Sequence, residues 1–69
     1  MKLKNLRKIV TSLKGAPGTA EILIRRIDDY NPNWRNDYKV EVDIHTGEVL
    51  SKNLDVKEVE YIVFYTQLG

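Results

Sequence analysis

The stretch Asp37-Tyr-Lys-Val-Glu-Val-Asp-Ile-His-Thr-Gly-Glu-Val-Leu50 decides the fold. Every second residue in its first half is apolar, and the residues between are polar, which is the pattern of a half-buried antiparallel strand. The apolar set is Tyr38, Val40, Val42 and Ile44. Gly47 then supplies the positive φ that reverses the chain, and a return strand follows. The stretch therefore predicts a β-hairpin over residues 37–52 and a small α+β domain.

The residues before the hairpin predict one helix and one strand. Over residues 2–14, leucine, isoleucine and valine recur at helical spacing on an arc about 120° wide, with lysine and arginine opposite. Gly15-Ala-Pro-Gly18 ends this helix. Residues 20–28 are rich in β-branched side chains and predict the first strand. Residues 29–36 are rich in turn formers and predict a loop.

Residues 53–69 carry two competing signals. Asp55 followed by Glu58 resembles a capping box, and Leu54 with Val59 matches a hydrophobic staple, which together favour a helix over residues 55–67. The run from Val59 to Tyr65 is β-branched and aromatic, which favours a fourth strand instead. We take the helix as the first expectation, because two local signals mark its start.

The expected architecture is therefore helix, three strands, helix, with a three-stranded antiparallel sheet and both helices on one of its faces. Apolar side chains from all five elements would form the core: Leu6, Ile9, Val10, Leu13, Ile22, Ile24, Tyr38, Val40, Val42, Ile44, Val59, Ile62 and Val63. The other sheet face would stay open to solvent and carry Leu23, Arg25, Ile27, Lys39, Glu41 and Asp43.

Size and composition bound the class of protein. A chain of 69 residues forms one domain with a thin core. It contains no cysteine, so disulfides and thiol catalysis are excluded. Basic residues interrupt every apolar run, so we expect no export signal, no membrane span and a cytoplasmic location. Residues 1–20 carry a charge of +5 and the remainder −4.

No arrangement of residues identifies a reaction. His45 lies in the predicted turn with only Asp43 and Glu48 near it, a poor set for a metal or for catalysis, and we expect a solvated turn residue. The spacing of Asp29, Asn31 and Asn33 resembles a calcium loop, but the glycine and glutamate that such a loop needs are absent. We therefore expect no enzyme, no catalytic residue, no metal and no cofactor.

The residue types typical of binding hot spots cluster around one polar loop. Trp34 lies there between Tyr30 and Tyr38, beside Arg35 and near Arg25 and Arg26 in the chain. Leu23 and Ile27 would add apolar contacts on the open sheet face. The alternative for Trp34 is a lid over the sheet edge.

Three modes of action remain open. The first hypothesis is a module that binds a larger host protein through Tyr30, Trp34, Arg35, Arg25, Arg26, Leu23 and Ile27. The second is a small nucleic-acid-binding domain in which Lys4, Arg7, Lys8 and Lys14 contact phosphates. The third is a homodimer formed through a sheet edge or the open face.

Three resemblances accompany these hypotheses. The expected order of elements resembles that of double-stranded-RNA-binding domains, although residues 55–60 are acidic where that family has a lysine cluster. Residues 37–50 resemble the hairpin of PepSY-type domains. In size, polarity and absence of a motif, the chain is similar to small phage and mobile-element proteins, including anti-CRISPR inhibitors. That last resemblance implies a protein that inhibits or regulates a larger partner by covering part of its surface.

Overall fold

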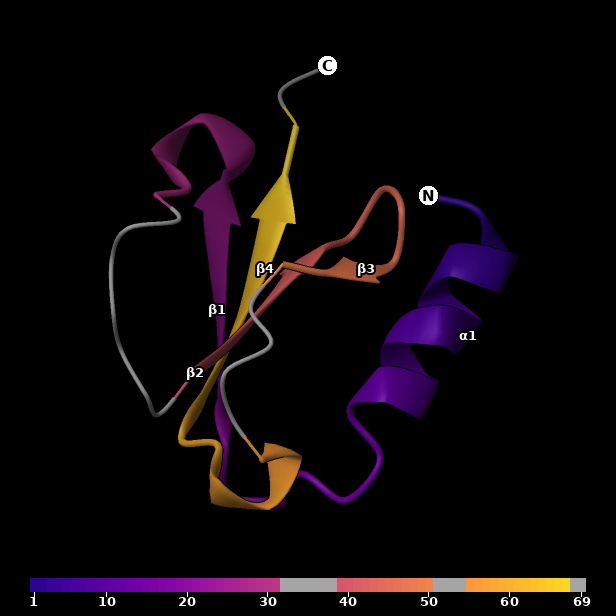
Figure 1. The fold of residues 1–69 in the computed structure, drawn as a ribbon. Helices are drawn as coiled ribbons and strands as arrows, with labels where there is room; N and C mark the ends of the chain where they lie inside the picture. The colour runs from indigo at the N-terminus through magenta and orange to yellow at the C-terminus, as the bar shows by residue number, and fades with distance from the viewer. Residues whose placement is uncertain (32–38, 51–54, 68–69) are drawn as a thin grey trace.

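The computed structural model describes residues 1–31, 39–50 and 55–67, which form one helix and a mixed four-stranded sheet (Figure 1). The elements are α1 (Leu3–Ser12), β1 (Glu21–Arg26), β2 (Lys39–Asp43), β3 (Glu48–Val49) and β4 (Tyr61–Thr66), with single 3-10 turns η1 (Ile27–Asp29) and η2 (Val56–Glu58). The strand order is β1-β4-β2-β3. β4 is parallel to both of its neighbours, and only β2 and β3 are antiparallel. The α+β class is confirmed, and the expected three-stranded antiparallel sheet is replaced by this mixed one.

The helix expected over residues 55–67 is wrong, and the alternative of a fourth strand is correct. Asp55 does cap a turn, because its carboxylate accepts a hydrogen bond of 3.0 Å from the Lys57 amide. That turn is η2, which ends at Glu58. The β-branched and aromatic run of β4 then pairs with strands on both sides, which satisfies its backbone groups as a helix would. A second helix beside α1 is therefore absent from the described residues.

The predicted hairpin is confirmed in β2 and β3. Val42 pairs with Val49, and Gly47 has a φ of +75° in the turn between the strands. This turn also holds the helix, because the Asn5 side chain donates a hydrogen bond to the carbonyl of His45. α1 consequently lies against the β3 end of the sheet (Figure 1).

One face of the sheet packs on α1 and forms the core. In the register, Ile22 and Val40 both lie beside Ile62, and Ile24 and Val42 both lie beside Phe64, so these residues share that face. The buried cluster contains Ile9, Val40, Val42, Val59 and Ile62. The expected membership of the core is thus correct for the five residues of this cluster and wrong for several residues of α1 and β1. Val63 is buried, but on the opposite face beside Glu41, and Tyr38 lies outside the described residues.

The opposite face is not open, which corrects the second expectation about the sheet. Lys39 and Glu41 leave only 4% of their surface exposed, and Val63 and Tyr65 beside them are equally buried. Strand alternation correctly predicts the side of the sheet on which these residues lie, but it does not predict whether that side is covered. Arg25 at the edge of this face is exposed, and Leu23 is half-buried.

Candidate binding surface

α1 presents an apolar stripe that the core does not use. Leu3, Leu6 and Val10, called the α1 stripe below, are 59%, 42% and 64% exposed. They follow one another at i, i+3 and i+7, so they lie on one side of the helix. Ile9 and the half-buried Leu13 supply the contact with the sheet. The expectation that Leu6 and Val10 belong to the core is therefore wrong.

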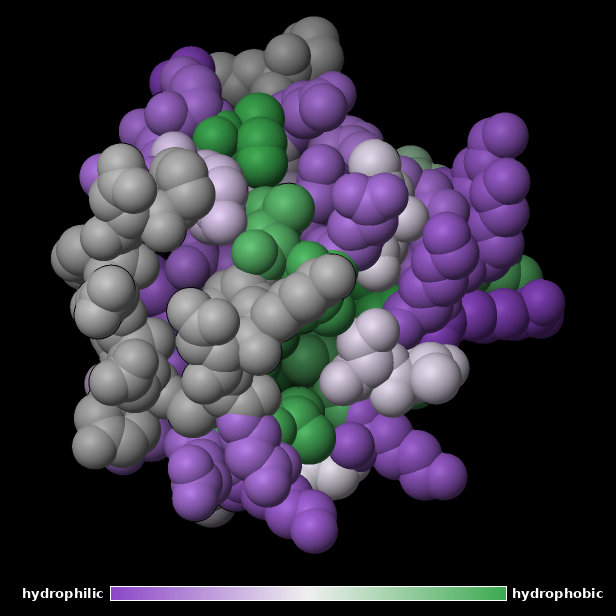
Figure 2. Space-filling view, in the orientation of Figure 1, coloured by the Kyte–Doolittle hydropathy of each residue, from purple (hydrophilic) through white to green (hydrophobic). Residues whose placement is uncertain are grey.

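β1 also exposes apolar side chains on the face that α1 packs against. Ile22 is 52% exposed and Ile24 is 69% exposed, although both were expected in the core. The reason is width: four strands about 4.8 Å apart extend beyond what one helix about 10 Å across can cover. Since α1 lies at the β3 end, the β1 end stays uncovered. Figure 2 shows hydrophobic surface running through the middle of the molecule, bordered by hydrophilic residues.

The basic face of α1 lies beside the hairpin turn. Lys4, Arg7, Lys8 and Lys14 are all exposed. The first three line a shallow, open hollow on the surface, which is completed by Thr11, Ser12 and Gly47. Lys14 comes after the end of α1 and does not line the hollow. The α1 stripe and this basic face together make the first twelve residues both apolar and cationic, without an acidic side chain.

The structure describes only some of the residues predicted to form the binding surface around the polar loop. Trp34 and Arg35 lie outside the described residues, and their role stays a prediction. Leu23, Arg25 and Tyr30 lie on the side of the sheet that carries Tyr65: Leu23 and Arg25 share its face, and the Tyr30 ring meets the Tyr65 ring edge-on at 5.3 Å. Tyr30 is half-buried, and its hydroxyl donates to the carbonyl of Leu50.

Arg26 and Ile27, the other two residues predicted for this surface, do not lie with Leu23, Arg25 and Tyr30. Arg26 points to the other face and forms an exposed ion pair of 3.0 Å with Asp28. Ile27 is half-buried in η1 rather than in the strand. The structure therefore brings Leu23, Arg25 and Tyr30 to one side of the sheet and separates Arg26 from them.

The buried polar groups form a cluster with a structural role. Glu41 lies 3.5 Å from the Lys39 ammonium and accepts a hydrogen bond of 2.5 Å from the Tyr65 hydroxyl. Burial, and then the hydrogen bond to Glu41, raise the pKa of Tyr65 above its ordinary value, so the phenol stays protonated and keeps donating. The cluster is too buried to meet a substrate, and its chemistry is that of a satisfied polar network.

His45 is not the solvated turn residue that the sequence indicated. It is half-buried, its ring Nε2 accepts a hydrogen bond of 3.0 Å from the Gln67 amide, and its own amide donates to Asp43. It therefore ties the hairpin turn to the end of β4. Among the described residues, no group of three or more histidine, aspartate or glutamate side chains could hold a metal ion.

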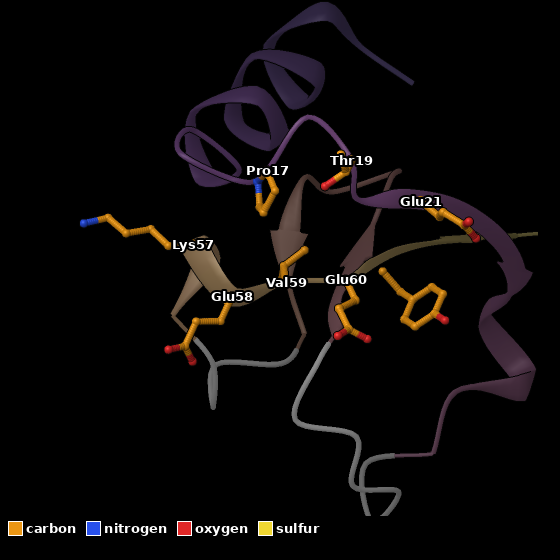
Figure 3. A pocket seen from close by; sticks show the side chains of 8 residues that line it. Pro17, Thr19, Glu21, Lys57, Glu58, Val59 and Glu60 are labelled. Carbon is orange, nitrogen blue, oxygen red and sulfur yellow. The ribbon is translucent and has the colours of Figure 1, made fainter.

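A second hollow, of about 400 Å³, lies where η2 meets the start of β1 (Figure 3). Its charged lining residues are Glu21, Lys57, Glu58 and Glu60. In Figure 3 the three carboxylates point apart rather than toward a common centre. The hollow therefore has the geometry of a solvated surface rather than that of an ion site.

The exposed apolar residues are the part of the surface that sequence reasoning missed. Their spacing fits a core helix and a core strand, so the pattern alone predicts burial. The exposure of these residues could have been predicted from the conformation of residues 61–66. Because these residues form a strand, the sheet is wider and no second helix covers it within the described residues.

Comparison with known proteins gives no relative: no family model, no curated protein and no solved structure matches this chain. The order of elements no longer resembles that of double-stranded-RNA-binding domains, because β4 replaces their second helix. Within the described residues, no helix combines the length and the apolar character needed to cross a membrane.

Proposed function

We propose that this chain is a non-enzymatic protein-binding module that regulates or inhibits a larger partner by covering part of its surface. The observation that supports the proposal is the α1 stripe, which leaves three large apolar side chains in water on the only α-helix of the described residues. Exposed apolar side chains at helical spacing are the anchors by which a helix docks into a groove. Occlusion by a small domain is also how the phage and mobile-element inhibitors of similar size act.

The charge of α1 specifies the chemistry of the partner. Arg7 borders the stripe, Lys4 and Lys8 lie further round the helix, and no acidic side chain occurs among residues 1–20. A complementary surface would offer an apolar groove bordered by carboxylates, because opposite potentials speed the encounter and exclude wrong partners. The partner we propose is therefore a larger protein with an acidic, apolar groove.

Replacing Leu6 and Val10 together with serine is expected to weaken partner binding at least about tenfold, since anchor residues of an interface each contribute on the order of 1–2 kcal/mol. Both side chains are exposed, so the fold should survive. The measurement is affinity capture of the partner from nuclease-treated extract of the native cells, followed by titration of the captured protein. Glu58→Ser/Glu60→Ser is the matched control, with two exposed side chains replaced outside α1 and β1. Equal binding by the Leu6/Val10 variant and the wild type would contradict the proposal.

A second candidate function is nucleic-acid binding through Lys4, Arg7, Lys8 and Lys14, which the hollow beside Gly47 favours. If these residues contact phosphates, log K for a nucleic-acid duplex should fall by roughly 0.7–0.9 per log unit of salt for each contact. Lys4→Gln/Arg7→Gln should then lower the slope by about two contacts. Fluorescence anisotropy with a labelled duplex measures both. Affinity that does not change with salt would exclude this candidate and leave the protein-binding function intact.

A further inference from the structure

β1 is an edge strand of the sheet that the described residues form. It pairs with β4 on one side, and none of the described residues pairs with it on the other. Natural edge strands are usually blunted by proline, a bulge or an inward-pointing charge. β1 has none of these in its centre, Ile22-Leu23-Ile24, which is apolar. We propose that two copies of this chain pair antiparallel through their β1 edges across a two-fold axis, which joins their sheets into one of eight strands.

The backbone of β1 offers the correct groups for this pairing. The Glu21 amide donates to the Glu60 carbonyl at 3.0 Å, so Glu21 directs its backbone groups toward β4. The Thr66 hydroxyl, also on β4, donates to the carbonyl of Arg25. Because direction alternates along a strand, Ile22 and Ile24 direct their N–H and C=O groups outward. Two such residues on facing copies can exchange both hydrogen bonds.

A two-fold axis at Leu23 gives a register in which apolar side chains lie opposite apolar ones and charged side chains lie opposite the opposite charge. Ile22 then lies opposite Ile24 of the second copy, and Leu23 lies opposite its own equivalent. Glu21 lies opposite Arg25 of the second copy, so the axis generates two pairs of opposite charge, and all of these residues except the half-buried Leu23 are exposed. An axis at Ile24 would instead place Leu23 opposite Arg25 and Ile22 opposite Arg26. Charge and hydropathy therefore agree on a single register.

This inference does not rest on the proposed function. α1 lies at the β3 end of the sheet and β1 at the other (Figure 1). Pairing through β1 leaves the α1 stripe and its basic face accessible in both copies. Partner binding and self-association can therefore succeed or fail separately, and the variants that test them share no residue of α1.

Exchanging the charges of Glu21 and Arg25 tests both the pairing of the two β1 strands and its register. Sedimentation velocity over rising concentration should show wild-type dimers. Glu21→Arg and Arg25→Glu should each raise the dissociation constant about tenfold, because each puts like charges opposite one another twice. The double variant E21R/R25E should restore the wild-type value to within about threefold, since it restores both pairs. Arg26→Glu, with the same change in charge on the other face, is the matched control.

Amide hydrogen exchange gives a readout that does not depend on substitution. The outward amides of Ile22 and Ile24 should become protected as the protein concentration rises, whereas that of Leu23, bonded to β4, should be protected throughout. Sedimentation as a monomer up to millimolar concentration would overturn the proposal. So would a dimer in which the double variant is no tighter than the single ones, or in which the Ile22 and Ile24 amides exchange at the same rate at every concentration.

Discussion

Replacing Glu41 by alanine is expected to lower the free energy of unfolding by about 3 kcal/mol, because the change removes a buried carboxylate that pairs with Lys39 and accepts from Tyr65. The carboxylate serves both the Lys39 ammonium and the Tyr65 hydroxyl, and all three side chains are almost fully buried. A domain of this length has a total stability of roughly 3–10 kcal/mol. Urea denaturation followed by circular dichroism should therefore show the midpoint of the transition at a clearly lower urea concentration than in the wild type.

The matched control removes the whole polar cluster. In Lys39→Met/Glu41→Leu/Tyr65→Phe, apolar side chains of similar volume replace all three groups, and the stability should return to within about 1 kcal/mol of the wild type. Recovery would show that the loss in Glu41→Ala comes from the lost polar interactions of the carboxylate rather than from a cavity. A Glu41→Ala variant as stable as the wild type would show that this face of the sheet is open, as the strand pattern alone predicts.

Replacing Gly47 by alanine is expected to lower the free energy of unfolding by about 3 kcal/mol, from backbone strain and a steric clash together. Gly47 has a φ of +75°, and a Cβ there would lie 2.7 Å from the backbone oxygen of Asn5. That oxygen belongs to α1, whose backbone cannot yield as a flexible side chain could. The hairpin turn and the helix would have to separate, which would also strain the contact between Asn5 and His45.

Gly18→Ala is the matched control for this substitution. No atom lies within 4 Å of a Cβ built at Gly18, and its φ is not positive. Its stability should stay within about 0.5 kcal/mol of the wild type in the same urea titration. Equal stabilities of the Gly47 and Gly18 variants would contradict the close contact between α1 and the hairpin turn.

The hairpin and the first strand were predictable because a single physical pattern governs each. Alternation from residue 38 to 44, followed by Gly47, leaves one register for β2 and β3. The C-terminal segment was not predictable in the same way. Asp55 caps a turn in both outcomes, and only pairing of β4 between two strands far away in the sequence decides against a helix. The β-branched run favours the strand and the cap favours the helix, so local signals alone do not decide between them.

The candidate surface was predicted less well than the fold, for a related reason. The exposure of Leu6 and Ile24 depends on how many strands the sheet has and where α1 lies over them, which spacing within one element does not contain. The burial of Lys39 and Glu41 likewise depends on their partners across the sheet. The basic residues of α1 were placed correctly in solvent, since a face opposite an apolar arc stays wet whatever the arc contacts.

The two proposals together describe a bivalent molecule. In a dimer joined through β1, the two α1 surfaces would stand at opposite ends of an eight-stranded sheet. A partner that presents its acidic groove twice would then be held more tightly than by one copy, because the second contact becomes intramolecular. The charge-exchange variants of β1 would weaken such binding without touching α1.

The most direct test of the central claim is affinity capture from extract with and without nuclease treatment, with wild-type protein and Leu6→Ser/Val10→Ser on parallel supports. We expect one protein to be retained in stoichiometric amount by the wild type and to be lost from the variant, since the α1 stripe supplies the apolar anchors. Retention of the same protein by both forms would contradict the assigned surface. Recovery that disappears with nuclease would contradict protein binding and assign the basic face of α1 to nucleic acid.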